Sequence, residues 1–153
     1  MSTLSQLEFA RNYTLGRLEK VEAAAWDDQP EGFNNTIRWN AGHIYSSMEY
    51  FITLVCPEYT AHHPEWGTFF GTGTRPGEWS GNPPSQEELL EALKEQPGRI
   101  RAALEGKLDV PAAKPITIGA LSMETVGETV EFIVWHEGLH AGVIDALSRI
   151  TKK

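Results

Sequence analysis

The chain has 153 residues, 41% of them hydrophobic, which is the size of one domain and enough apolar material for a core. We therefore expect a single domain over residues 1–153. Thirteen Lys and Arg residues against 21 Asp and Glu residues give a formal net charge of -8, and the basic residues are scattered along the chain. This balance argues against a surface that wraps a phosphate backbone, so we expect no nucleic-acid partner.

The cellular compartment can be predicted from the length of the apolar runs and from the number of cysteines. The first 20 residues lack the apolar core of a signal peptide, and no apolar run approaches the length that spans a bilayer. We therefore expect a cytoplasmic protein with no membrane partner. The one cysteine, Cys56, cannot form a disulfide within the chain and has no neighbour that marks it for activation. We interpret it as a small apolar residue near a helix end.

The first half of the chain carries two segments with helical periodicity. The first begins near Ser5, where Ser5 and Glu8 form a capping-box pattern, and it runs towards Ala25. The second begins after Asn35 and continues to about Val55. Its apolar side chains alternate in steps of three and four, which keeps one face of the helix against a partner helix.

The second half carries two more such segments. One begins at Ser85 with Glu88 as its capping-box partner, and Pro97 predicts a kink or a short break within it. The last begins near Thr125 in another capping-box pattern and runs to about Ile150. Its expected inward stripe is Val126, Val130, Ile133, His136, His140, Val143, Leu147 and Ile150. Two positions of an otherwise aliphatic stripe are therefore histidines.

The connections between these segments differ in length. We expect short connectors between the first and second helices and between the third and fourth. Residues 56–84 are longer, rich in Gly and Pro, and carry Trp66, Phe69, Phe70 and Trp79. A loop this long is usually functional or packed over another element, so we expect these aromatics to cover part of the helices and to contribute to a site or a dimer contact. The predicted fold is all-α, a four-helix bundle with a long crossover loop between helices two and three.

Three histidines form the candidate metal site. His136 and His140 are four residues apart, so on a helix both imidazoles project from one face, one turn apart. His43 lies on the inward half of the second helix, and a neighbouring helix of a bundle can place a third ligand opposite such a pair. Three imidazoles with an open fourth position are typical of a catalytic metal site, whereas four ligands close a structural one. His62 and His63 are weaker candidates, because adjacent loop histidines cannot both turn easily to one ion.

One motif suggests a different enzyme. Residues 136–140 read HEGLH, which matches the pattern of zinc proteases whose Glu acts as general base. Those proteases need a third ligand downstream, and the 13 residues after His140 contain neither His nor Glu. We therefore predict no peptidase activity and interpret Glu137 as a carboxylate that flanks the site or supports a ligand.

Several segments together resemble one known family. They are TIRWNAGHI at 36–44, FFGTGTRPGEW at 69–79, PPSQEELL at 83–90 and TVGETVEFIVWHEGLHAGVI at 125–144. These residues resemble the DinB-like family of four-helix metalloproteins, also called the damage-inducible or YfiT-like superfamily. The resemblance implies that His43, His136 and His140 bind the metal, that a long crossover joins helices two and three, and that the protein is a homodimer. The family often has Gln three residues after the last of these histidines, where this chain has Val143.

The resemblance also implies a chemistry. Characterised relatives include metal-dependent S-transferases that use low-molecular-weight thiols such as bacillithiol or mycothiol, and isomerases that act on thiol adducts. We therefore predict one divalent ion per chain, with zinc expected and nickel as the alternative, and transfer of a bacillithiol-type thiol to an electrophile in detoxification. A metal-dependent small-molecule hydrolase and a non-catalytic metal- or ligand-binding dimer are the two alternatives. No residue beyond the three histidines is assigned a role.

Overall fold

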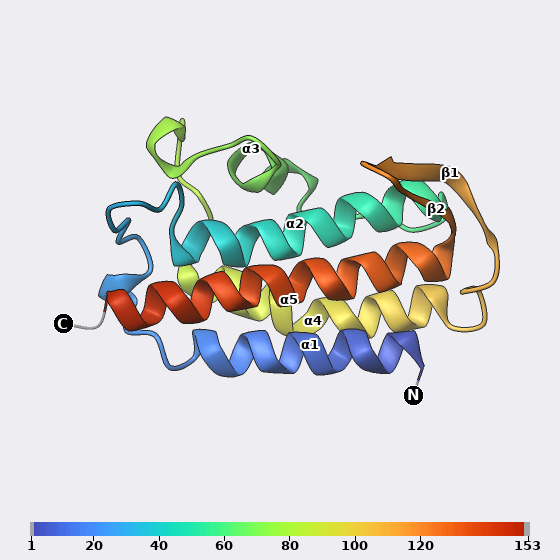
Figure 1. Cartoon of the computed structure of the whole chain (residues 1–153), viewed down its shortest axis with the longest axis horizontal. Helices are drawn as coiled ribbons and strands as arrows, with labels where there is room; N and C mark the ends of the chain where they lie inside the picture. Colours follow the sequence, from blue (N-terminus) through green and yellow to red (C-terminus); the bar gives the residue numbers. More distant parts are fainter. Residues whose placement is uncertain (1, 152–153) are drawn as a thin grey trace.

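Four long helices lie side by side in the computed structural model, which describes residues 2–151 (Figure 1). They are α1 (Thr3–Leu18), α2 (Ile37–Val55), α4 (Gln86–Leu104) and α5 (Val126–Ile150). α5 contacts both α1 and α2, and α4 contacts the same two helices. The structure therefore places α2 beside α5, as the spacing of the histidines requires. Across residues 2–151, no helix is both long and apolar enough to span a bilayer.

The last two long helices begin as the sequence predicts. Ser85 accepts a hydrogen bond from the backbone N–H of Glu88, and the Glu88 carboxylate accepts one from the backbone N–H of Ser85. Thr125 and Glu128 form the same reciprocal pair at the start of α5. Each capping box satisfies N–H groups that have no partner within the helix, which fixes the first turn.

The start of α1 differs from the prediction. Its cap is Ser2, whose side chain accepts a hydrogen bond from the N–H of Ser5, so the capping box predicted at Ser5 is wrong. α1 ends at Leu18, and only a short 3-10 turn, η1, follows at Ala23–Ala25.

α2 also begins one residue later than predicted. Thr36 rather than Asn35 caps it, accepting a hydrogen bond from the N–H of Trp39.

A β-hairpin stands where a short connector was expected. β1 (Pro111–Ile118) and β2 (Leu121–Thr125) pair antiparallel between α4 and α5, so the all-α prediction is wrong here. The two-residue turn starts at Gly119, whose φ of 59° is a conformation that glycine adopts without strain. β-branched residues before such a turn are typical of a hairpin. β1 contacts α2 and α5, and β2 contacts α5.

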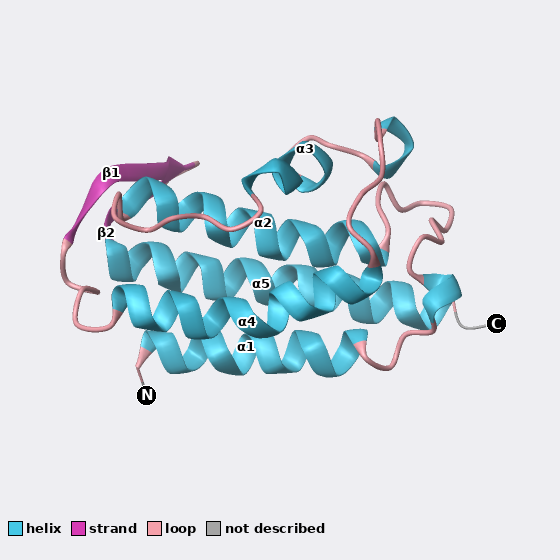
Figure 2. Ribbon diagram, turned by 180° about the vertical axis from the view of Figure 1, so that it is seen from behind, coloured by secondary structure: helices cyan, strands magenta, loops and turns pink. Residues whose placement is uncertain are grey.

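The crossover between α2 and α4 contains only short helical turns. They are η2 (Pro64–Trp66), α3 (Gly67–Phe70) and η3 (Pro76–Glu78). α3 packs against α2, on the same side of the long helices as the hairpin (Figure 2). Phe70 is fully buried, and Phe69 and Trp79 pack against the same cluster of core residues. The crossover aromatics therefore cover part of the helices, as predicted.

The inward face of α5 is rotated from the predicted one. Its fully buried residues are Val126, Gly127, Thr129, Val130, Ile133, Glu137, Ala141, Ile144 and Leu147. Glu137 thus takes a central core position, whereas His136 and His140 are half-buried and Ile150 is 56% exposed. The two histidines therefore lie at the edge of the core and not within it.

Glu137 is paired with Arg11 of α1. Both side chains are 1% exposed, and Nε and Nη2 of Arg11 donate to the two carboxylate oxygens at 2.7 and 3.1 Å. The hydroxyl of Thr14 donates to the same carboxylate at 3.0 Å. These charge-assisted hydrogen bonds offset the cost of taking two charges out of water. The Glu of the HEGLH motif is therefore part of the core polar network.

Pro97 does not interrupt α4, so the predicted break is absent. A proline inside a helix has no N–H and leaves the carbonyl four residues earlier without its usual donor. That carbonyl belongs to Leu93, and it accepts a hydrogen bond from Nη1 of Arg11 at 2.8 Å. The helix continues because α1 supplies the donor that the proline removes.

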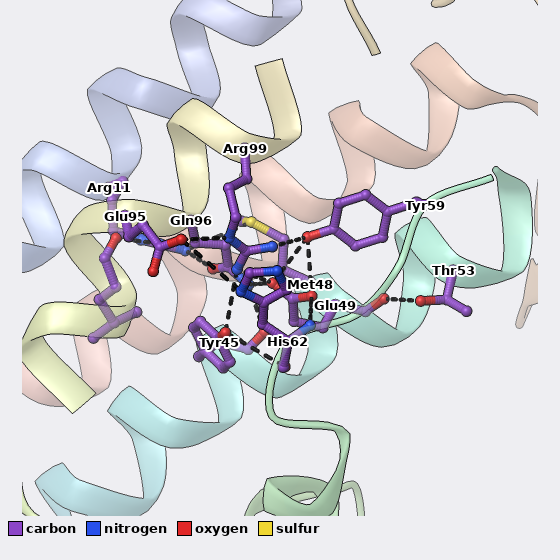
Figure 3. A network of polar contacts seen from close by, with 11 residues as sticks. Arg11, Tyr45, Met48, Glu49, Thr53, Tyr59, His62, Glu95, Gln96 and Arg99 are labelled. Carbon is purple, nitrogen blue, oxygen red and sulfur yellow. Dashed lines mark hydrogen bonds and ion pairs between the residues drawn. The ribbon is translucent and has the colours of Figure 1, made fainter. Parts of the chain in front are cut away.

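The polar network extends from Arg11 to the crossover (Figure 3). The side chain of Gln96 accepts from Nη2 of Arg11 at 2.9 Å and donates to the carboxylate of Glu49 at 2.8 Å. Glu49 also accepts from Arg99 and from the backbone N–H of His62. The network therefore links α1, α4 and α2 to the beginning of the crossover.

Removing Arg11 tests how much the fold depends on this network. In Arg11→Met, the Glu137 carboxylate would remain buried without its partner, and we expect the free energy of unfolding to fall by about 3–5 kcal/mol in urea denaturation. Arg17→Met is the control, because Arg17 pairs with Asp145 across the same two helices but is 36% exposed. Its loss should stay under about 1 kcal/mol. Equal losses in the two variants would contradict the prediction.

Candidate metal centre

Three imidazoles from two helices meet, as predicted. His43 comes from α2 and His136 and His140 from α5, and one ring nitrogen of each lies within 4.8 Å of the others. Nε2 of His43 is 3.2 Å from Nε2 of His136. Two nitrogens that bind one zinc ion tetrahedrally, at about 2.0–2.1 Å each, are about 3.3–3.4 Å apart. The observed spacing fits two ligands of a single ion.

His43 is oriented by the crossover. Its Nδ1 lies 2.6 Å from the carbonyl oxygen of Phe70, so this nitrogen carries the proton and donates, and Nε2 is left with a lone pair. The ring also stacks on Trp39, with centroids 4.5 Å apart and planes 12° apart. A hydrogen bond from the second ring nitrogen to a carbonyl is the usual support for a histidine that binds a metal.

A glycine permits this contact. The fully buried ring of Phe70 sits directly over Gly42 of α2, where a Cβ atom would lie 2.5 Å from its Cδ1. Glycine is unfavourable within a helix, and here it allows α3 to approach α2 closely enough to place the Phe70 carbonyl on His43. The turn after α3 is also held in place, because Trp39 donates from its indole N–H to the hydroxyl of Thr74 at 2.9 Å.

His140 is oriented by Asn40 of α2. Oδ1 of Asn40 lies 2.8 Å from Nδ1 of His140. The amide nitrogen of Asn40 donates to Asn35 Oδ1 and to the carbonyl of Thr36, both at 2.8 Å, which fixes the amide so that its oxygen faces the imidazole. Nδ1 of His140 must therefore donate, and Nε2 is again left with a lone pair. Sequence reasoning missed Asn40, although it lies three residues before His43 on the same helix.

Two further side chains, one aromatic and one with a hydroxyl, lie beside the cluster. The ring of Phe132, one turn before His136, lies 5.9 Å from that imidazole at an interplanar angle of 29°. On α2, the hydroxyl of Ser47 lies 3.3 Å from Nε2 of His43. The cluster therefore has an aromatic wall on α5 and a hydroxyl on α2.

All three imidazoles are held in the neutral form. Burial lowers the pKa of His136 to about 4, and the neighbouring His43 lowers it further. Burial and both neighbouring imidazoles lower the pKa of His140 to about 3. Burial also lowers the pKa of His43, opposed in part by the hydrogen bond to the Phe70 carbonyl. Near neutral pH the cluster can therefore offer three lone pairs to a divalent ion.

The other candidates lie outside the cluster. The side chains of His62 and His63 are 47% and 46% exposed, and the ring of His63 stacks on Trp66 at 4.1 Å. Cys56 is buried and donates to Glu58, and its burial raises the pKa of the thiol. This supports the interpretation of Cys56 as an unreactive residue at the end of α2.

Fold and site together define a helical protein with three imidazoles that could hold one metal ion. The family model described as the DinB superfamily matches residues 6–144, a range that includes all three histidines. The chain belongs to the DinB superfamily. A search of curated proteins gives no match.

Asn40 should support metal binding without touching the ion. In Asn40→Ala, Nδ1 of His140 loses its acceptor, and we expect zinc affinity to fall about 10–100-fold. Asn35→Ala is the matched control, because it removes one of the two acceptors of the Asn40 amide but leaves the Thr36 carbonyl and the bond to His140 in place. Competition with a chromophoric chelator measures both affinities. An unchanged affinity in Asn40→Ala would show that the bond does not orient the ligand.

The neutral imidazoles also predict how the metal-free protein responds to acid. Below about pH 6.5 the unfolded chain binds more protons at these histidines than the native protein does, because the pKa of each is lowered in the native protein. Proton binding at these histidines therefore lowers the free energy of unfolding of the metal-free protein as the pH falls from about 6.5 towards 4.

Urea denaturation of the metal-free protein at several pH values measures this effect. The double variant His136→Ala/His140→Ala should lose less stability over this pH range than the wild type. His62→Ala, in which an exposed imidazole is removed, should follow the wild type. Parallel pH profiles in the double variant and the wild type would contradict the prediction.

Proposed function

We propose that this chain is a metal-dependent S-transferase, which joins a low-molecular-weight thiol of the bacillithiol type to an electrophile in detoxification. The observation that carries the proposal is the cluster of His43, His136 and His140, in which two of the three lone pairs are directed by hydrogen bonds on the opposite ring nitrogen. Membership of the DinB superfamily supports a metal at this cluster. The four long helices and the crossover support the four-helix bundle expected of this family.

The proposed reaction is a displacement. The thiol sulfur forms a bond to the electrophilic carbon while the bond from that carbon to its leaving group breaks, and the thiol proton is released with the leaving group. A divalent ion, zinc by expectation and nickel as the alternative, lowers the pKa of a thiol that it binds. The chain orients the three imidazoles and surrounds them with the rings of Trp39 and Phe132.

The HEGLH motif does not support peptide hydrolysis. A general base of that kind needs a carboxylate free to take a proton beside the ion. Here both oxygens of Glu137 accept hydrogen bonds from Arg11, and the side chain is 1% exposed. We therefore assign Glu137 to the core of the protein.

Dimerisation and location complete the proposal. We propose that the protein acts as a homodimer in the cytoplasm. The exposed rings of Phe9 and Tyr13 on α1, 71% and 46% exposed, support an association through apolar surface. The single cysteine supports a reducing compartment.

Thiol consumption by the purified, metal-loaded protein tests the activity. With monochlorobimane as the electrophile, bacillithiol, mycothiol and glutathione are compared, and we expect consumption of one of them well above the rate without protein. His140→Ala should lose the metal by elemental analysis and the activity, while circular dichroism shows most of the helicity retained, because core packing holds the helices. His62→Ala is the control and should keep both.

Two results would replace the proposal with another function. Cleavage of esters or amides in the absence of any thiol would indicate a hydrolase. One metal ion per chain without turnover of any of these substrates would indicate a metal- or ligand-binding protein.

A further inference from the structure

An apolar groove lies between the hairpin and the first half of α5. Its apolar lining comes from Ile118, Leu121 and Met123 of the hairpin and from Phe132 and Trp135 of α5, and it encloses about 530 Å³. Small-molecule sites usually have volumes of about 300–1,000 Å³. Leu121 and Trp135 are 50% and 59% exposed, so large apolar side chains from both walls face this space. We call it the hairpin groove.

The ring of Phe132 lies both on the wall of the hairpin groove and beside the histidine cluster. The ring of Phe132 lines the groove, and its other neighbour along α5 is the imidazole of His136, 5.9 Å away. Trp135 lies 5.5 Å from Phe132 on the groove side, and Phe51 of α2 packs edge-on against Phe132 at 5.4 Å. A molecule that reaches the cluster with its reactive atom can therefore place an apolar group on Phe132 and Trp135.

The charged residues that line the groove limit the class of molecule that it can bind. The polar residues that line the groove are Ser122, Glu128 and Glu131, and among residues 2–151 no Lys or Arg lines it. Glu128 is occupied by the capping box of α5, and Glu131 is exposed at the rim. Carboxylates without a cation disfavour an anionic ligand. Because Glu128 is committed to the capping box and Glu131 is exposed to solvent, neither is a buried partner for a cation, and the apolar lining suits an uncharged aryl or branched alkyl group.

The segment that leads into the hairpin is fixed to the start of α5. The N–H of Val126 donates to the carbonyl of Val110 at 3.0 Å, and the N–H of Gly127 donates to the carbonyl of Leu108 at 2.8 Å. A Cβ atom on Gly127 would lie 2.9 Å from that carbonyl oxygen, so the glycine allows this close approach. The base of the hairpin is therefore held against α5 before a ligand arrives, which lowers the entropic cost of ordering this side of the groove.

We propose that the hairpin groove binds the uncharged apolar group, aryl or branched alkyl, of the electrophile on which the histidine site acts. This inference rests on the proposed transferase function, which it deepens by naming the class of substrate. Phe132 and Trp135 form one wall and contact the apolar group directly, and Leu121 closes the opposite wall.

The probe for this inference is 4-fluorobenzyl alcohol, a small uncharged aromatic, followed by 19F NMR. With zinc-loaded protein the 19F resonance should shift on titration, and with cobalt-loaded protein the bound probe should be broadened by the nearby paramagnetic ion. Trp135→Ala and Leu121→Gln should each weaken binding at least about fivefold, because an aromatic or aliphatic contact is lost. Leu139→Ala is the control, since Leu139 is also exposed on α5, at 50%, but does not line the groove.

The outcomes separate this inference from the proposed function. Probe binding that depends on Trp135 and is broadened by cobalt, in a protein without thiol transfer, would support the groove and reject the transferase. Thiol transfer together with probe binding that neither groove variant changes would reject the groove alone. Probe binding without broadening would place the probe away from the histidines and overturn the inference. If Trp135→Ala turns a dimer into a monomer in sedimentation and leaves probe binding unchanged, the groove is an interface between copies and the inference fails.

Discussion

The arrangement of the helices depends on the hydrogen bonds that the buried guanidinium of Arg11 donates. A cation that is 1% exposed must find partners for its N–H groups inside the protein, and these are Glu137 on α5 and the Leu93 carbonyl and Gln96 side chain on α4. Because Glu137 lies between His136 and His140, this pairing also sets the rotation of α5 about its axis. The two imidazoles then face α2 and meet His43. A charged pair outside the histidine cluster thus influences where the imidazoles point.

The sequence was informative where the signal is local. The capping boxes at Ser85 and Thr125 and the four-residue spacing of the histidines involve residues within one or two turns, and the structure reproduces them. Glu137 was interpreted as a carboxylate that flanks the site or supports a ligand, and its core pairing was missed because a local pattern cannot detect a partner on α1, 126 positions away. The hairpin was missed for a different reason. Its strands are short and mostly exposed, so they lack the clear alternation that predicts a strand.

In the site, too, some features could be predicted from the sequence and others could not. The side chains that could bind a metal can be recognised from their residue type, but the groups that orient them cannot. Phe70 acts on His43 through its backbone carbonyl, which every residue possesses, and only the packing of its ring over Gly42 brings that carbonyl into place. From the sequence alone, Asn40 could equally be a residue on the helix surface. Only the structure shows that its Oδ1 lies 2.8 Å from Nδ1 of His140. The sequence therefore indicates which histidines could bind a metal, whereas the orientation of their rings depends on the packed fold.

The proline in α4 has a consequence for how the chain folds. An isolated α4 would have a carbonyl at Leu93 that only water could satisfy, in addition to the steric cost of Pro97, so its middle turns are weak on their own. The donor that repairs this defect comes from Arg11, 82 positions earlier in the chain. α4 can therefore become fully stable only after α1 has docked against it. Local helix formation and long-range assembly are coupled at this point, so α1 and α4 should gain their protection against amide hydrogen exchange as one cooperative unit.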